Sequence, residues 1–219
     1  DRRALLNAMA GISATGGSTN GVLHLLAIAH EAGVPLTLEE LTDVAGRTPV
    51  IADLAPSGRW MAEDFHRAGG TRAVIRELIR GGHVDGDAPT VDGRTLAEAT
   101  DDAPQPDGEV IYAVEAPFKP TGALHTLRGN LAPEGSLVKV SATSRRAHRG
   151  PARVFDSEEA CCDGVRAGRV VAGDVLVVRN EGPAGAPGMP EMLSITSAIV
   201  GRGLGDSVVL VTDGRFSGA

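Results

Sequence analysis

Residues 101–108, Asp-Asp-Ala-Pro-Gln-Pro-Asp-Gly, separate two parts of the chain that differ in hydrophobic periodicity. This stretch is rich in turn-forming residues, which is typical of a linker. Before it, apolar residues recur at helical spacing. After it, short β-rich runs lie between glycine and proline turns. We therefore predict an α/β protein in which residues 1–105 are mainly helical and residues 106–219 form a second, strand-containing domain.

The first part carries several helix signals. Apolar residues in the segment 18–32 line one helical face, with Ser18 or Thr19 able to cap its start and Gly33 its end. Thr37-Leu38-Glu39-Glu40 matches a capping box and predicts a helix over residues 38–45. A short apolar run that Gly11 closes, residues 4–10, and the segments 59–68 and 72–80 are further predicted helices.

The second part alternates strand and helix patterns. Strands are predicted over residues 124–127, 136–141, 152–155, 174–178 and 207–211. A helix with Ser157 as its N-cap is predicted over residues 157–167, and another starts near Met189. Strands with interspersed helices indicate a compact α/β or barrel-like unit.

The composition excludes several classes of protein. The formal net charge of -7 argues against a general nucleic-acid binder, which normally has a basic surface. No stretch approaches the roughly 20 apolar residues that span a bilayer. The only cysteines, Cys161 and Cys162, are adjacent and lack disulfide or metal-site spacing, which favours the cytoplasm. The chain begins at Asp1 and ends at Ala219 after a glycine-rich turn, so we expect both ends to lie inside a longer protein.

The first candidate site is Gly16-Gly17-Ser18-Thr19-Asn20, directly before a predicted helix. Glycines let a backbone approach a ligand closely, and the N–H groups at a helix start favour an anion. The side chains of Ser18, Thr19 and Asn20 are candidates to bind a substrate carboxylate. The alternative is helix capping, which needs only one of these residues.

The second candidate is the glycine- and proline-rich loop 182–192, which follows a predicted strand and contains one acid, Glu191. A carboxylate oxygen suits Mg²⁺, which often takes only one or two protein ligands. Alternatively, Glu191 is an acid in the first turn of a helix. The loop is no P-loop, because the Lys-Ser/Thr ending is absent.

The third candidate is the turn Thr212-Asp213-Gly214-Arg215-Phe216-Ser217-Gly218, just past a predicted strand. Ser217 at a strand exit is a candidate alkoxide base beside a Lewis-acidic metal, and Arg215 is a candidate substrate contact. Arg215 stands where a nucleophile elbow has its first glycine, so the hydrolase motif is not matched. The alternative for Ser217 is a hydrogen bond to its own backbone in the turn.

In their order along the chain, five segments resemble the dihydroxy-acid dehydratase and phosphogluconate dehydratase family, which also contains sugar-acid dehydratases. The matching segments are residues 16–20 with 22–25, 63–70 (Glu-Asp-Phe-His-Arg-Ala-Gly-Gly), 127–133 (Leu-Arg-Gly-Asn-Leu-Ala-Pro), 182–192 and 213–218 (Asp-Gly-Arg-Phe-Ser-Gly). Each segment alone is weak, but the ordered set is highly specific.

The resemblance implies a fold: the end of an N-terminal α/β domain followed by a β-barrel-like swivelling C-terminal domain. It implies a hydro-lyase that turns a 2,3-dihydroxy carboxylate into a 2-keto acid. It implies that Glu191 ligates Mg²⁺ and that Ser217 takes the proton from C2, while a [2Fe–2S] cluster acts as Lewis acid on the C3 hydroxyl. It also implies a homodimer.

The chain departs from the family in one respect. The family's cluster cysteines, together with an Asp and a modified Lys that ligate Mg²⁺, belong upstream of Asp1, and Cys161 and Cys162 match none of them. The chain also stops short of the family's C-terminal end. We therefore expect the 219 residues alone to be inactive.

Three alternatives remain beside the preferred substrate, a dihydroxy acid of branched-chain amino-acid biosynthesis. The segment 185–191, with Arg179 and Asn180 before it, favours a sugar-acid dehydratase of the same family. A non-catalytic swivelling module that binds carboxylate or phosphate is the second. A serine hydrolase that uses Ser217 is the third, but it lacks an identifiable partner base.

Overall fold

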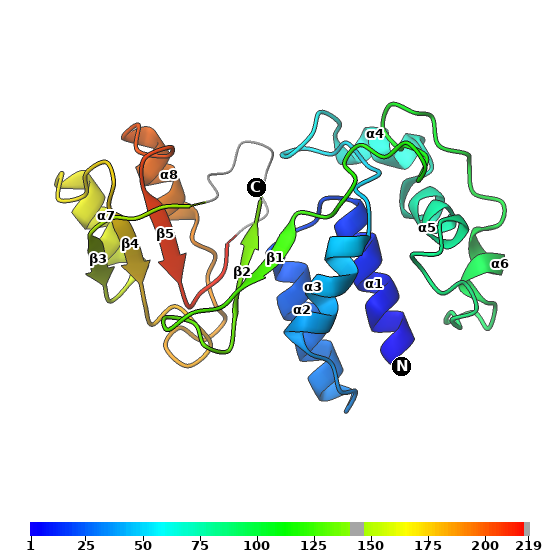
Figure 1. The fold of residues 1–219 in the computed structure, drawn as a ribbon, viewed down its shortest axis with the longest axis horizontal. Helices are drawn as coiled ribbons and strands as arrows, with labels where there is room; N and C mark the ends of the chain where they lie inside the picture. The colour runs from blue at the N-terminus through cyan, green and yellow to red at the C-terminus, as the bar shows by residue number, and fades with distance from the viewer. Residues whose placement is uncertain (141–146, 217–219) are drawn as a thin grey trace. The chain divides into compact units, whose positions relative to one another are not determined.

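The computed structural model describes residues 1–140 and 147–216, which fall into two compact units, residues 1–140 and residues 147–216. None of the helices in these residues is long and apolar enough to cross a membrane. The first unit contains α1 (Arg2–Ala14), α2 (Thr19–Glu31), α3 (Leu38–Arg47), α4 (Ala62–Arg67), α5 (Gly70–Arg80), α6 (Leu96–Thr100), β1 (Leu124–Leu127) and β2 (Ser136–Lys139). The second contains β3 (Ala152–Phe155), α7 (Glu158–Arg166), β4 (Val175–Val178), α8 (Leu193–Gly201) and β5 (Val209–Thr212) (Figure 1).

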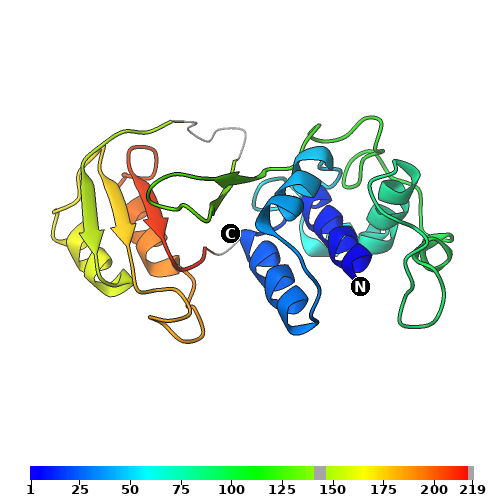
Figure 2. The same cartoon turned by 60° about the horizontal axis from the view of Figure 1, so that its bottom comes forward.

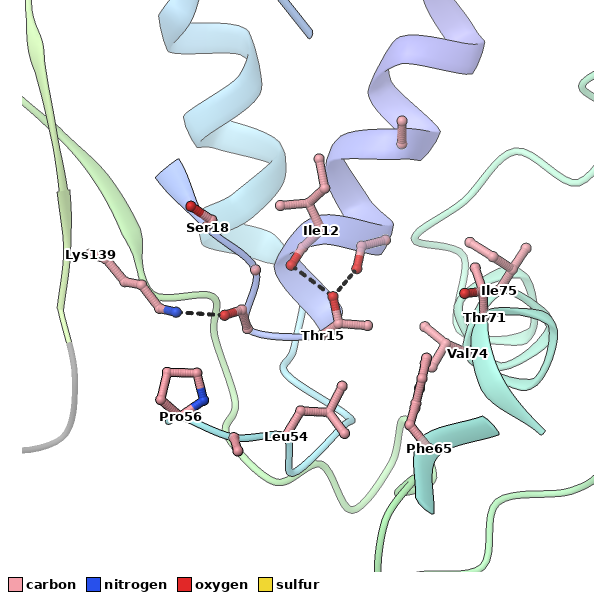
Figure 3. Close-up of a pocket in the computed structure, with 15 residues that line it drawn as sticks. Ile12, Thr15, Ser18, Leu54, Pro56, Phe65, Thr71, Val74, Ile75 and Lys139 are labelled. Carbon is pink, nitrogen blue, oxygen red and sulfur yellow. Dashed lines mark hydrogen bonds between the residues drawn. The ribbon is translucent and has the colours of Figure 1, made fainter. Parts of the chain in front are cut away.

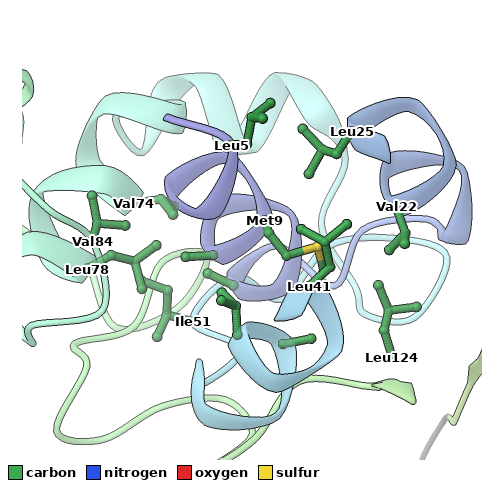
Figure 4. Packing of buried hydrophobic residues seen from close by; sticks show 14 of the residues in the cluster. Leu5, Met9, Val22, Leu25, Leu41, Ile51, Val74, Leu78, Val84 and Leu124 are labelled. Carbon is green, nitrogen blue, oxygen red and sulfur yellow. The ribbon is translucent and has the colours of Figure 1, made fainter. Parts of the chain in front are cut away.

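Helix α1 forms the centre of the first unit. It packs against α2, α3 and α5, and α3 in turn packs against β1. Figure 4 shows the apolar side chains that meet around α1, among them Met9, Leu41 and Leu78, which are fully buried. Burial of these side chains is the main force that holds the helices together, because each contributes roughly 1.5–3 kcal/mol when removed from water.

Capping residues set where α2 and α3 begin, as predicted. The Ser18 side chain accepts a hydrogen bond from the Asn20 N–H at 3.1 Å and caps α2. Thr37 and Glu40 form a reciprocal capping box at the start of α3. Each bond satisfies a backbone donor that a helix start leaves without an intrahelical partner.

Two helical predictions are corrected, and one helix was not predicted. Helix α1 continues past Gly11 to Ala14, because a glycine inside a helix costs only about 1 kcal/mol and the turn beyond it is buried. Helix α4 begins at Ala62 rather than at residue 59, because the backbone N–H and guanidinium of Arg59 are bound to Asp53 in the preceding turn. Helix α6 was missed, although its start carries a capping box of Thr95 and Glu98.

Residues beyond 105 continue the first unit. Strands β1 and β2 pair antiparallel, with Leu124 opposite Lys139, and both Ile111 and Leu124 are buried in the core of the helices. Both strands lie where they were predicted, although the predicted second strand also includes Ser141, which lies outside the described residues. The domain boundary at 105/106 stays a prediction.

The second unit is a parallel α/β layer. Strands β3, β4 and β5 lie in that order, and Figure 2 shows them side by side. Helices α7 and α8 connect them and pack on the same face of β4, where Leu176 and Val178 are buried. All three strands and α7 lie within two residues of their predicted positions, whereas the last predicted helix begins at Leu193 rather than near Met189.

The α/β class is confirmed, but the barrel-like form expected of the second domain is not. Within residues 1–140 and 147–216, the strands form a two-stranded and a three-stranded sheet, and neither closes on itself. The reason is the connection between the strands: each parallel neighbour is reached through a helix, and these helices cover the sheet face.

Replacing Leu41 by alanine is expected to lower the free energy of unfolding of the first unit by about 2–5 kcal/mol, because it opens a cavity in a fully buried site. Urea unfolding followed by far-UV circular dichroism measures the loss. The matched control is Leu131→Ala, at a leucine that is 67% exposed and whose loss should change stability by less than about 0.5 kcal/mol. Equal effects of the two substitutions would show that α1 does not pack on α3 as described.

Candidate functional site

Two loops leave the carboxyl ends of β4 and β5 and are fastened to each other. The Asp213 carboxylate accepts hydrogen bonds from the backbone N–H groups of Asn180 at 3.1 Å and Glu181 at 3.0 Å. Because β4 and β5 are parallel neighbours, with Val178 opposite Thr212, both loops start at the same edge of the sheet. In open α/β sheets this edge is where ligands usually bind.

Glycines allow these loops to approach closely. A Cβ atom added to Gly182 would lie 2.9 Å from the carbonyl oxygen of Asp213. One added to Gly214 would lie 2.9 Å from the Cβ of Glu181. Contacts this short do not occur between real Cβ atoms and their neighbours, so a larger residue at either position would separate the loops.

The two loops meet a second time where Glu191 lies beside Arg215. The two residues form a parallel β-bridge, in which the N–H of Met192 donates to the carbonyl of Arg215 at 3.1 Å. The Nε of Arg215 donates to the carbonyl of Met189 at 2.7 Å. The guanidinium group therefore holds the backbone of the loop that carries Glu191. The prediction that Arg215 also contacts substrate stays a prediction.

Ser217 lies outside the described residues, so its predicted role as a base stays a prediction. The described chain ends at Phe216, which is partly buried and packs against the core of the second unit. Arg215, which forms the bridge with Glu191, thus lies two residues before Ser217 in the sequence.

The chemistry of Glu191 fits one ligand of a hard cation. Glu191 is partly buried. It precedes Met192, the N-cap of α8, so it is not an acid of the first helical turn. Mg²⁺ often takes one or two protein carboxylates and completes its shell with water and substrate. Among residues 1–140 and 147–216, no group of three or more His, Cys, Asp or Glu side chains is arranged to hold a metal ion.

The turn Gly16-Gly17-Ser18 serves the two helices that it joins. Gly16 has a φ of +63°, which favours glycine. The N–H of Gly17 donates to the carbonyl of Ile12 at 2.8 Å, and an added Cβ on Gly17 would lie 2.8 Å from that oxygen. The backbone N–H groups of Gly17 and Asn20 thus donate to acceptors within the chain, as expected of helix capping. Substrate binding by Ser18, Thr19 and Asn20 stays a prediction.

An open pocket of about 530 Å³ lies next to this turn, within the first unit. Figure 3 shows Ser18 and Lys139 at one end of it and Phe65, Val74 and Ile75 at the other. The Nζ of Lys139 donates to the Gly16 carbonyl at 2.7 Å. Burial, and secondarily the charge of Lys119, lowers the pKa of Lys139 below its ordinary value. Sequence reasoning missed Lys139, because only the pairing of β2 brings it to the turn.

Comparison with known proteins identifies the family. The model for the N-terminal domain of dihydroxy-acid/6-phosphogluconate dehydratases matches residues 1–99, and the model for the C-terminal domain matches residues 109–219. The chain belongs to the dihydroxy-acid/6-phosphogluconate dehydratase family. The two matches lie on either side of residues 101–108, where the hydrophobic periodicity changes.

Several curated relatives match throughout. The chain is 57% identical over 219 residues to a dihydroxy-acid dehydratase of Roseiflexus castenholzii, and 54% identical over 218 residues to dihydroxy-acid dehydratase 2 of Bordetella bronchiseptica. It is 53% identical over 219 residues to a dihydroxy-acid dehydratase of Thermus thermophilus. These alignments cover 99–100% of this chain but only 38–40% of each relative, so the chain spans about two fifths of their length.

The segment 63–70, one of those that resemble this dehydratase family, forms α4 and the turn into α5. Gly69 in this turn has a φ of +107°, and an added Cβ would lie 2.8 Å from that of Ala73. Phe65 projects from α4 into the pocket beside Ser18 and Lys139. The turn that contains Ser18 and the segment 63–70 thus border the same cavity, although Ser18 and Glu63 are 45 positions apart in the sequence.

The two cysteines do not fit an iron–sulfur cluster. Cys161 and Cys162 are free, buried residues on α7 with 0% and 3% exposure. Burial raises the pKa of the Cys161 thiol to about 12 and also raises that of Cys162. Both side chains lie in the apolar core of the second unit, so the pair serves as packing in this member of the dehydratase family.

Replacing Asp213 by alanine is expected to accelerate amide hydrogen exchange at Asn180 and Glu181, because both N–H groups lose their acceptor. The free energy of unfolding should fall by about 1 kcal/mol, the usual net value of such bonds at a partly exposed site. Native-state exchange measured by NMR tests the first effect. Asp163→Ala on the exposed surface of α7 is the control. Unchanged protection at both amides in the Asp213 variant would rule out the fastening of the loops.

Proposed function

We propose that the protein of which these residues are part is a dehydratase that converts a 2,3-dihydroxy carboxylate to a 2-keto acid. The observation that carries the proposal is 52–57% identity, over essentially the whole chain, to proteins named dihydroxy-acid dehydratase. The paired loops at the strand ends support it, since they hold Glu191 next to the segment that leads to Ser217.

In this proposal the residues of the chain have distinct roles. Ser217 Oγ takes the proton from C2 of the substrate. Ser18, Thr19, Asn20 and Arg215 are the residues proposed to bind polar groups of the substrate. The C2 proton and the C3 hydroxyl leave together as one molecule of water, which gives an enol that tautomerises to the 2-keto acid.

Glu191 is the proposed protein ligand of Mg²⁺ within this chain. When bound, the ion supplies positive charge that holds the carboxylate end of the substrate. Asp213 is a positioning residue, because its bonds hold the loop of Glu191 and not the substrate itself. The bond from Arg215 Nε to the Met189 carbonyl holds the same loop, in addition to the substrate contact proposed for Arg215. Gly182 and Gly214 also help to position this loop, because they permit the close contact between it and the turn after β5.

The [2Fe–2S] cluster is proposed to rest on cysteines outside these 219 residues. Cys161 and Cys162 are adjacent on α7 and pack in the core of the second unit, and they lack the spacing of cluster ligands. The relatives are about two and a half times as long as this chain, which leaves room for such ligands. We accordingly propose that the 219 residues alone do not catalyse the reaction.

Branched-chain amino-acid biosynthesis is the proposed pathway, because it matches the names of the relatives. The sugar-acid alternative rests on the loop 185–191 with Arg179 and Asn180 before it. In the structure Arg179 pairs with Asp156, and Asn180 Nδ2 donates to the Asp156 carbonyl at 3.1 Å. These contacts give both side chains a role in holding the loop, so the sugar-acid reading gains no support from them.

Two further alternatives are weaker. A non-catalytic anion-binding module would not want a carboxylate such as that of Glu191 at the centre of its site. A serine hydrolase needs a base beside Ser217, and the sequence offers none in the usual arrangement. A cytoplasmic homodimer with a small-molecule substrate is the proposed state of the whole protein.

In the full-length protein, prepared without oxygen, Ser217→Ala is expected to lower kcat by at least about a hundredfold, because it removes the proposed base. The 2-keto acid formed from 2,3-dihydroxy-3-methylbutanoate measures turnover, and circular dichroism checks the fold. Ser207→Ala, a serine whose hydroxyl donates to the Leu204 carbonyl, should retain activity. Full activity of the Ser217 variant would remove this residue from the mechanism, and wild-type protein without iron would end the dehydratase proposal.

A further inference from the structure

The first turn of α8 follows Glu191 directly and is held by a residue of another helix. Met192, the N-cap of α8, makes no capping hydrogen bond with its side chain. The backbone N–H of Ile195, at the third position of the helix, instead donates to the Glu158 carboxylate at 3.0 Å. A capping side chain normally accepts from an N–H at this position. Glu158, the first residue of α7, therefore supplies the cap that the sequence of α8 lacks.

A second carboxylate holds Glu158 in place. The backbone N–H of Glu158 donates to the Glu181 carboxylate at 2.6 Å, and Glu181 is only 7% exposed. The backbone N–H of Glu181 in turn donates to the Asp213 carboxylate at 3.0 Å. Three acidic side chains, each accepting from a backbone N–H, thus connect the turn after β5 to the start of α8.

The bond from Ile195 to Glu158 lies where its loss cannot easily be replaced. The side chains of Met192 and Ile195 are 1% and 0% exposed, and α7 packs against α8. A backbone donor in such surroundings is costly to leave without an acceptor. We therefore expect the first turn of α8 to unwind toward water when the Glu158 carboxylate is removed.

Such a change would reach Glu191, because the chain on both sides of this residue is tied down. Arg215 holds the carbonyl of Met189 before it and accepts from the N–H of Met192 after it. Met192 is also where α8 begins, so the same residue belongs to the turn that Glu158 caps. A metal ligand has to be held within about 0.5 Å of its productive position by the residues around it.

We infer that Glu158 is a positioning residue for the carboxylate of Glu191, on which it acts through the first turn of α8 and not by contact with substrate or metal. The inference rests on the proposed function for the role of Glu191 as a ligand of Mg²⁺. Glu181 supports Glu158 in this role. By sequence alone, Glu158 and Glu159 are equivalent, because both place a negative charge at the start of α7. Only the packing of α7 on α8 distinguishes them.

Binding of Mn²⁺ to the full-length protein, prepared without oxygen and followed by the electron paramagnetic resonance signal of the free ion, tests the inference. Glu158→Ala should raise the dissociation constant of Mn²⁺ about tenfold, the lower end of what loss of a supporting residue costs a metal site. Glu158→Gln removes the charge but keeps an oxygen acceptor, so it should retain most of the affinity. Glu159→Ala removes the neighbouring, exposed acid and should leave the affinity unchanged.

Amide hydrogen exchange of residues 190–197, followed by mass spectrometry in the absence of divalent ions, gives a second readout. Exchange should accelerate in Glu158→Ala and stay slow in Glu158→Gln and Glu159→Ala. Circular dichroism checks that each variant folds. If Glu158→Ala does not fold, Glu158→Asp carries the same test, because its shorter side chain keeps the charge but cannot reach the N–H of Ile195.

Wild-type Mn²⁺ affinity in the alanine or aspartate variant at position 158 would overturn the inference, as would an equal loss in Glu159→Ala. Failure of the proposed metal site has a different signature, namely that Glu191→Ala binds Mn²⁺ as tightly as the wild-type protein. Loss of binding in Glu191→Ala together with full binding in the position 158 variant would overturn the inference alone.

Discussion

The Asp213 carboxylate holds together the two loops on which the proposed chemistry depends. By accepting the N–H groups of Asn180 and Glu181, it ties the exit of β5 to the exit of β4. The loop that follows Glu181 then returns to Arg215, where the bridge with Glu191 and the bond from Arg215 to Met189 close it. Without this tie, a loop rich in glycine and proline would have little to fix the position of its single carboxylate.

The sheet makes this tie possible. Parallel strands place their carboxyl ends at one edge, and the helices α7 and α8 bury the face beneath it through Leu176, Val178, Ile195 and their neighbours. The edge is thus rigid, while the loops above it carry the polar groups. In the first unit, α1 and its buried neighbours play the equivalent part, and the turn between α1 and α2 borders the pocket with Lys139. Each unit therefore presents its candidate residues from a packed core.

Local signals predicted the elements well where a few neighbouring residues decide them. Ser18 and the box of Thr37 and Glu40 predicted the starts of α2 and α3, because a capping bond spans only two or three residues. The short β-rich runs predicted every strand of the described residues to within two residues. The prediction that the first helix ends before Gly11 was wrong, because packing against the other helices outweighs the weak helix propensity of one glycine.

Long-range contacts were beyond the reach of these signals. The approach of Lys139 to Gly16 joins residues 123 positions apart, and the bonds of Asp213 span more than 30 positions. Loop composition pointed to Glu191 and the turn after β5 separately, but only the strand register brings them to one edge. The assignment of a dehydratase came from resemblance in ordered segments, which the family models and relatives support.

The location of the divalent cation in the full-length protein tests the central claim most directly. Crystals of that protein grown with Mn²⁺ in place of Mg²⁺ would reveal the ion by its anomalous scattering. The account predicts one bound ion with a carboxylate oxygen of Glu191 at about the coordination distance of 2.0–2.2 Å typical of hard cations in octahedral sites. An ion bound away from Glu191, with the loop after β4 still fastened to Asp213, would contradict it.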